Sequence, residues 1–153
     1  MKLALACLML ATATASATPA EPAKKPACSS AGAPVVEIKL VQLGSEPAGH
    51  VTKIFKGDGW RVQDIDKAGK VSDDKQGCAD SADVKDLRAK LDKAKWKITT
   101  ARNHCMAMAT TSTEYRVKGK LVWTERMCSG QTLDQDSAAA IDAVKAIVAK
   151  LTP

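Results

Sequence analysis

His104 and Cys105 are adjacent in the chain, and an imidazole beside a thiol can do chemistry. A neighbouring imidazolium favours the nucleophilic thiolate. Adjacent residues rarely present both side chains to one substrate, however, and the sequence around them lacks the pattern of a cysteine protease. We therefore expect Cys105 to form a structural disulfide and His104 to lie in an exposed loop.

The second histidine, His50, follows Gly49 in a segment that we expect to be a turn, and no partner for it is evident. No nucleophile elbow of the form G-x-S-x-G and no H-E-x-x-H helix occurs. We assign no catalytic residue, and the sequence favours a protein that is not an enzyme.

The chain has five cysteines. Cys7 lies in an expected signal peptide, and its removal leaves an even set that can pair in an oxidising compartment. Cys105 and Cys128 flank an expected hairpin and form our first pair, although a perfectly regular hairpin does not place them opposite each other. Cys28 and Cys78 form the second pair. Four cysteines permit three pairings, and Cys28 can alternatively join another chain.

Two patterns could indicate a metal. The cysteines together with His104 lack the closely spaced ligand pairs of a zinc site. Residues 64–75 begin like a calcium loop, but alanine occupies the fifth position and Lys75 the twelfth, where a bidentate glutamate belongs. We predict an Asp-rich turn in this segment, no metal site and no cofactor.

The amino-terminal residues indicate export. Residues 1–17 combine Lys2, a short apolar core and small residues at the expected cleavage site, as in a secretory signal peptide. Residues 18–34 contain four prolines and predict an extended tether, and residues 35–153 suffice for a single domain. The protein is expected to be periplasmic or secreted.

Charge and hydropathy exclude two classes of partner. The formal net charge is +6, but basic and acidic residues are interspersed, so no nucleic-acid-binding face is expected. No run of about 18 apolar residues follows the signal peptide, so no transmembrane segment is expected.

Extended runs alternate with turn signals. Residues 57–59 tolerate positive φ and predict an antiparallel meander, which continues in a short piece near Val71. A second turn at residues 118–120 predicts the clearest hairpin. The runs lie at 36–40, 51–56, 60–65, 106–117 and 121–127.

Two amphipathic helices are expected. Asp80 or Ser81 can cap the first, and residues 132–135 have the form of a capping box for the second. Their apolar stripes comprise Val84, Leu87, Leu91 and Ala94 in the first helix, and Ile141, Val144, Ile147, Val148 and Leu151 in the second. The sequence predicts an α+β fold, with an antiparallel sheet of about five strands and both helices on one face.

The order of strands, helix, hairpin and helix, with the segments DVKDLRAKL and AAIDAVKAIVAKL, is similar to that of small bacterial emfourin-like protease inhibitors. The resemblance spans about Val35 to Leu151 and depends on the arrangement and apolar spacing of the elements. It implies binding to metalloproteases of the thermolysin type. This chain differs by its signal peptide and four further cysteines, so no inhibitory residue is carried over.

We expect an exported, disulfide-stabilised binding module whose partner is another protein, with inhibition of a protease or other hydrolase as its concrete form. Disulfides preorganise surface loops and lower the entropic cost of docking. The alternatives are a small hydrolase or metal-dependent enzyme that uses His104, and a tethered protein of the cell envelope. The residues expected to bind are His50, Arg102, Asn103, His104, Lys118 and Lys120.

Overall fold

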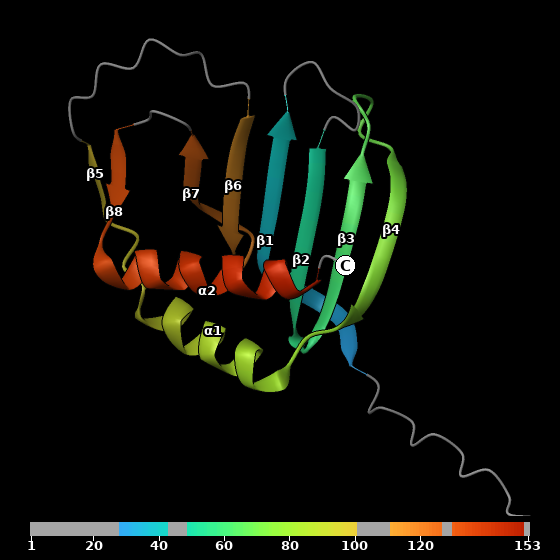
Figure 1. Ribbon diagram of the computed structural model, residues 1–153, viewed down its shortest axis with the longest axis horizontal. Coiled ribbons are helices and arrows are strands. Elements are labelled where there is room, and N and C mark those ends of the chain that lie inside the picture. Colours follow the sequence, from blue (N-terminus) through green and yellow to red (C-terminus); the bar gives the residue numbers. More distant parts are fainter. Residues whose placement is uncertain (1–27, 43–48, 101–110, 127–129, 152–153) are drawn as a thin grey trace, which may run out of the picture.

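The computed structural model describes residues 28–42, 49–100, 111–126 and 130–151. In chain order its elements are β1 (Ser29–Gln42), β2 (Gly49–Gly57), β3 (Gly59–Ile65), β4 (Val71–Cys78), α1 (Ser81–Lys93), β5 (Ile98–Thr100), β6 (Thr111–Val117), β7 (Lys120–Arg126), β8 (Gln131–Leu133) and α2 (Gln135–Leu151). Six strands form an antiparallel sheet in the order β4-β3-β2-β1-β6-β7, and β5 pairs with β8. The two helices lie side by side on one face of the main sheet, and α2 crosses its strands (Figure 1).

The α+β class agrees with the sequence-based prediction, but the described residues form eight strands, so the prediction of about five is wrong. Two of the additional strands, β5 and β8, have three residues each, which is too short for a visible alternation. β4 includes the short piece expected near Val71, but it is a longer edge strand that is exposed along nearly its whole length. Such a strand buries no face, so it leaves little periodic signal in the sequence.

The first strand begins inside the segment that we expected to be a tether. β1 starts at Ser29, before the domain boundary expected at Val35, and Ser29 pairs with Gly57 of β2. The two segments approach closely, because a Cβ atom added to Gly59 would lie 2.6 Å from the carbonyl oxygen of Ser29. Glycine at this turn therefore lets the start of β1 pack against the sheet.

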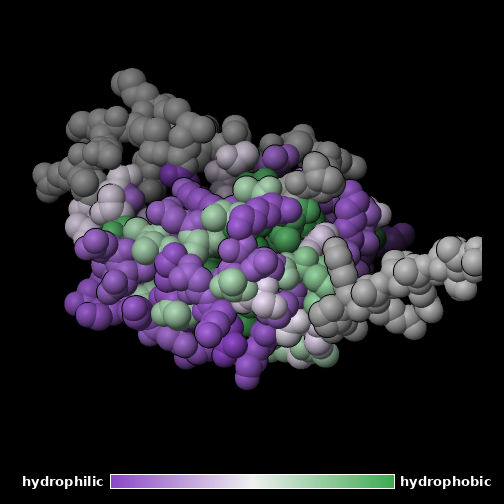
Figure 2. All heavy atoms as spheres, turned by 60° about the horizontal axis from the view of Figure 1, so that its bottom comes forward, coloured by the Kyte–Doolittle hydropathy of each residue, from purple (hydrophilic) through white to green (hydrophobic). Residues whose placement is uncertain are grey.

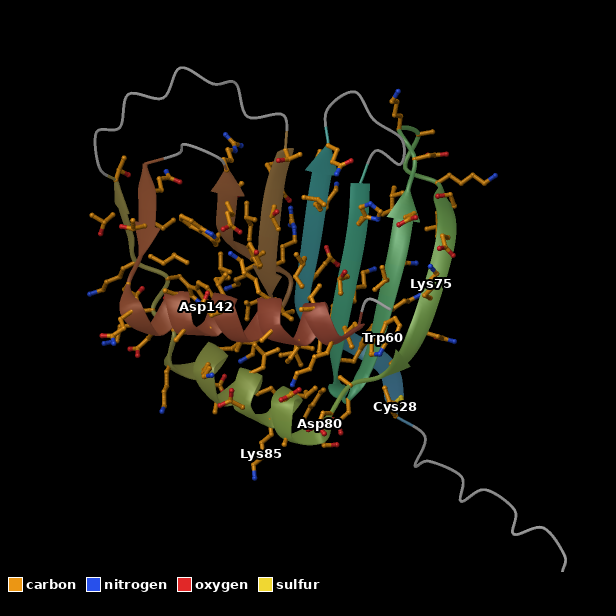
Figure 3. The ribbon with its side chains drawn as sticks, in the orientation of Figure 1. Cys28, Trp60, Lys75, Asp80, Lys85 and Asp142 are labelled. Carbon is orange, nitrogen blue, oxygen red and sulfur yellow. A yellow bond between two sulfur atoms is a disulfide. The ribbon has the colours of Figure 1, made fainter. Side chains whose placement is uncertain are left out.

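A disulfide holds the start of β1 in place. Cys28 is bonded to Cys78, the last residue of β4, with their Cα atoms 5.4 Å apart. Figure 3 shows Cys28 at the end of the sheet where α1 begins. This is the pair that the sequence analysis proposed. Cys105 and Cys128 lie outside the described residues.

The hydrophobic core lies between the sheet and the helices. Val36 of β1 pairs with Ile54 of β2 and Val117 of β6, so these three side chains share one face. Leu87 of α1 and Val144 of α2 belong to the same buried cluster, and both Ile54 and Leu87 are 0% exposed. Burial of an aliphatic side chain of this size contributes about 1.5–3 kcal/mol, which fixes both helices on this face.

The first helix begins as the sequence predicts. The Asp80 carboxylate caps α1 by accepting hydrogen bonds from the backbone N–H groups of Ala82 and Asp83. Its buried side is the predicted stripe of Val84, Leu87 and Leu91. Neither this helix nor α2, the two helices of the described ranges, has the length and apolar character needed to cross a membrane.

The second helix is capped by a different residue from the one expected. α2 begins at Gln135, and Asp134 accepts a hydrogen bond from the backbone N–H of Ser137. A capping box that starts at Thr132 is therefore wrong. Thr132 pairs with Thr99 in the small sheet, so its backbone is part of a strand and does not begin the helix.

The start of α2 is bonded to the segment that follows α1. Ser137 is 0% exposed, and its hydroxyl accepts the backbone N–H of Trp96, which has a φ of 54°. Asp134 accepts the backbone N–H of Lys97. The hydrogen bond from the Ser137 hydroxyl, followed by those from the backbone N–H groups of Lys97 and Ser137, lowers the pKa of Asp134. The carboxylate therefore remains charged at neutral pH and holds the two helical segments together.

The predicted hairpin is confirmed. β6 and β7 are joined by Lys118 and Gly119, whose φ values are 50° and 79°. Positive φ at both central residues is the geometry of a type I′ turn, which matches the twist of the two strands.

Candidate functional site

An apolar pocket of about 490 Å³ lies between the sheet and the C-terminal half of α2. Figure 2 views the helix-bearing side, where hydrophobic residues are exposed between hydrophilic ones. Most of the lining is aliphatic, so the pocket has the character of a binding site for an apolar group. The lining residues are Ile38, Leu40, His50, Thr52, Val62, Thr113, Tyr115, Val144, Lys145, Val148, Ala149 and Leu151.

Strand register brings the sheet side of the pocket together. Leu40 of β1 pairs with both His50 of β2 and Thr113 of β6, and Thr52 pairs with Val62 of β3. Side chains of paired residues point to the same face, so these five converge beside α2. The helix contributes apolar residues at spacings of four and three positions, which share one stripe. These are Val144, Val148 and Leu151.

His50 and Asp64 form a pair at one border of the pocket. Their Nδ1 and Oδ1 atoms are 2.5 Å apart, and their side chains are 39% and 27% exposed. The expectation that His50 lies in a turn without a partner is wrong, because His50 is the second residue of β2 and faces Asp64 across the β2–β3 ladder.

A second polar group lies at another border. The hydroxyl of Tyr115 donates a hydrogen bond to Glu125 Oε2 at 3.0 Å, and Lys145 Nζ donates to Glu125 Oε1 at 2.8 Å. Burial, followed by the negative charge of Glu125, raises the pKa of Tyr115. The phenol therefore stays protonated at neutral pH and acts as the donor in this group.

These contacts define what the pocket can bind. When His50 is neutral, an Asp64 carboxylate that accepts its Nδ1–H leaves Nε2 as a hydrogen-bond acceptor. The charge of Lys145 is already paired with Glu125. The pocket thus presents apolar walls between two internally paired polar groups, which suits a neutral apolar ligand group with a hydrogen-bond donor near His50.

Of the six residues that we expected to bind, the three that the structure describes lie at two separate places. His50 lines the apolar pocket. It pairs with Leu40, which also pairs with Thr113, so His50 lies on the side of the sheet where β6 begins. Lys118 and Lys120 lie at the hairpin turn after Val117, the opposite end of β6. Arg102, Asn103 and His104 lie outside the described residues.

The structure adds pocket residues that the sequence analysis did not assign to a site. Val144, Val148 and Leu151 were recognised as an apolar stripe but were assigned to the core. Tyr115 and Lys145 gave no sequence signal, because their shared partner Glu125 is identified only by tertiary contact.

The segment that begins like a calcium loop is a turn between β3 and β4. Oδ1 of Asp66 accepts the backbone N–H groups of Ala68 and Lys70, as in the Asp-rich turn that we predicted. Asp64, at its first position, is paired with His50. Within residues 28–42, 49–100, 111–126 and 130–151, no group of three or more His, Cys, Asp or Glu side chains could hold a metal ion.

No protein-family model, curated protein or solved structure matches the chain. The resemblance to emfourin-like inhibitors therefore stays a prediction from the order of the elements.

Proposed function

We propose that the protein is an exported, non-enzymatic binding module that takes an apolar side chain of a partner protein into the pocket beside α2. The observation that carries this proposal is the aliphatic lining of that pocket, about 490 Å³ in volume and bordered by His50. A pocket of this size and lining accepts a large aliphatic or aromatic side chain with its adjoining backbone.

The charges at the border favour a neutral ligand group. His50 is paired with Asp64, and Lys145 is paired with Glu125. Both charges already have an internal partner, and a backbone N–H can bond to Nε2 of a neutral His50 without displacing either partner. An apolar side chain flanked by peptide groups satisfies both conditions.

The disulfide and the predicted export support a role outside the cytoplasm. Cys28–Cys78 ties the first strand to the edge strand, which limits motion of the scaffold and so reduces the entropy lost on binding. Together with the resemblance in element order, this favours inhibition of a protease or another hydrolase as the concrete activity.

The proposal can be tested with a substitution that places a large side chain in the pocket and changes no buried core residue. Ala149 is an exposed residue of α2 that lines the pocket, and Ala146, on the same helix, is exposed and does not line it. We expect Ala149→Trp to abolish binding to peptides selected from a displayed random library, and to abolish inhibition of any responsive enzyme in a panel of secreted hydrolases. Ala146→Trp should retain both.

Two results count against the proposal. One is a selection that enriches no peptides with large apolar residues. The other is equal binding by the two tryptophan variants, because the pocket would then not be the site.

A further inference from the structure

A second pocket, about 390 Å³ in volume, lies at the end of the sheet where the β6–β7 hairpin turns. Three cationic residues from different elements line it: Lys56 at the end of β2, Arg88 of α1 and Lys118 of the turn. Its apolar lining includes Pro34 and Leu91. The single acidic residue in the lining is Asp92.

The positive charges around this pocket exceed the negative charge. Lys118 Nζ lies 3.4 Å from Asp92 Oδ1, but the two side chains are 75% and 68% exposed, so water screens their attraction. Within the described ranges, neither Lys56 nor Arg88 is within ion-pair distance of a carboxylate. Three positive charges therefore line this pocket, and its one negative charge is only weakly attracted to them.

The turn itself does not require a lysine. Lys118 has a φ of 50°, a conformation in which asparagine or glycine is favoured and a lysine side chain is disfavoured. Its backbone N–H donates to the carbonyl oxygen of Val35, a bond that any residue other than proline could make. The turn therefore does not require the charge of Lys118, whose ion pair with Asp92 is largely exposed to water.

We infer that this pocket binds a phosphate or sulfate monoester carried on an apolar group. The planar guanidinium of Arg88 can bond two oxygens of the anion, and Lys56 and Lys118 supply the remaining positive charge. The apolar carrier lies against Pro34 and Leu91. The inference is independent of the proposed function, because the two pockets share no residue.

The test is a titration of the intact protein with phenyl phosphate. The backbone amide NMR signals of Lys56, Leu91 and Lys118 monitor the binding. Binding should saturate and should be several-fold tighter than that of inorganic phosphate, because the ring covers apolar surface. Phenol should produce no saturable shifts at these residues. Equal affinity for phenyl phosphate and phenol would overturn the anion site, and equal affinity for the two phosphates would overturn the role of the apolar surface.

Variants locate the site. Arg88→Gln should weaken binding by about tenfold or more, since it removes charged hydrogen bonds. Lys118→Asn should also weaken binding, and the turn should remain intact because asparagine tolerates its φ. Lys85→Gln is the matched control: Lys85 lies on α1 and points away from the sheet (Figure 3), and it does not line the pocket.

The control variant should bind within about twofold of the wild type, because Lys85 does not line the pocket and an exposed charge outside it interacts only weakly with a bound anion through water. If Lys85→Gln weakens binding as much as Arg88→Gln, the attraction is a general charge effect and the site is rejected. Ala149→Trp should leave phenyl phosphate binding unchanged, so failure of the proposed function and failure of this inference can be distinguished.

Discussion

The hydroxyl of Ser137 donates a hydrogen bond to Asp134 Oδ2 at 2.7 Å and accepts the backbone N–H of Trp96 at 2.8 Å. It therefore connects the first turn of α2 with the segment that follows α1. Ser137→Ala would leave the Trp96 N–H without this partner in a half-buried position. We expect the free energy of unfolding to fall by about 1–3 kcal/mol, as measured by urea denaturation.

Ser72→Ala is a suitable comparison for this substitution. The Ser72 hydroxyl is exposed and makes one hydrogen bond of 3.3 Å, so its loss should change the free energy of unfolding by less than about 0.5 kcal/mol. Equal effects of the two substitutions would show that the Ser137 connection does not stabilise the fold.

Tyr115 should make stability depend on alkaline pH. Burial raises the pKa of its phenol in the folded protein, so the folded state keeps this proton when the unfolded chain has lost it. Its contribution to stability is complete below a pH of about 10 and decreases as the pH rises above that value. The chain has one tyrosine, so the tyrosinate absorbance near 295 nm reports the ionisation of Tyr115.

The neighbouring carboxylates separate the causes of this shift. Glu125→Gln removes the negative charge bonded to the phenol and should lower the pKa of Tyr115, although burial remains. Glu114→Gln makes the same charge change on the other face of β6, where Glu114 pairs with Arg116, and should have little effect. A Tyr115 titration that is unaltered by Glu125→Gln would contradict the role assigned to that carboxylate.

The Cys28–Cys78 disulfide should contribute strongly to stability. It closes a sequence separation of 50 residues, for which the chain-entropy model gives about 4 kcal/mol at 25 °C. We expect the Cys28→Ser, Cys78→Ser double variant to unfold at lower denaturant concentration and to be cleaved more readily near residues 29–34. Peptide mapping without reduction should recover the two cysteines in one linked fragment from the wild type, and their recovery as thiols would contradict this pairing.

Trp60 depends on the absence of a side chain at Gly77. The two residues are paired across β3 and β4, and a Cβ atom on Gly77 would lie 2.7 Å from Cζ2 of the indole. Gly77→Ala should displace the ring and lower the free energy of unfolding by about 1–3 kcal/mol, with a change in tryptophan fluorescence. Gln76→Ala, at the neighbouring exposed position, should cause neither change.

A smaller ring should relieve the contact. In a Trp60→Phe background, the same Gly77→Ala substitution should cost less than it does in the wild type, as a double-mutant cycle can measure. If the cost is equal in both backgrounds, the destabilisation has a cause other than the indole.

The sequence predicts which residues share a face better than it predicts what covers them. The spacing of Val84, Leu87 and Leu91 predicts the buried side of α1, and the structure confirms it. In β1 the same reasoning places Val36 and Leu40 on one face. It does not show that Val36 is covered by both helices while Leu40 lines an open pocket, because that difference depends on where α2 crosses the sheet.

The His50–Asp64 pair shows why the site was harder to predict. Symmetric pairing about Asp58, the middle of the turn, would place His50 opposite Asp66. The structure places it opposite Asp64. Asp58 has a φ of 63°, accepts a hydrogen bond from Ser81 and bonds to the backbone N–H of Ala79. Contacts with residues beyond β4 therefore fix the conformation of this turn, and a local sequence signal does not contain them.

The position of β1 in the sheet determines the order in which the molecule can assemble. Ile38 pairs on one side with Thr52, which is near in sequence, and on the other with Tyr115, which is distant. The β1–β4 meander can form through short loop closures, whereas one edge of β1 stays open until the chain has extended through β6. The long-range closure of β1 on β6 should therefore limit the folding rate, and until that step β1 would present an edge of unpaired backbone N–H and C=O groups on which another chain could pair.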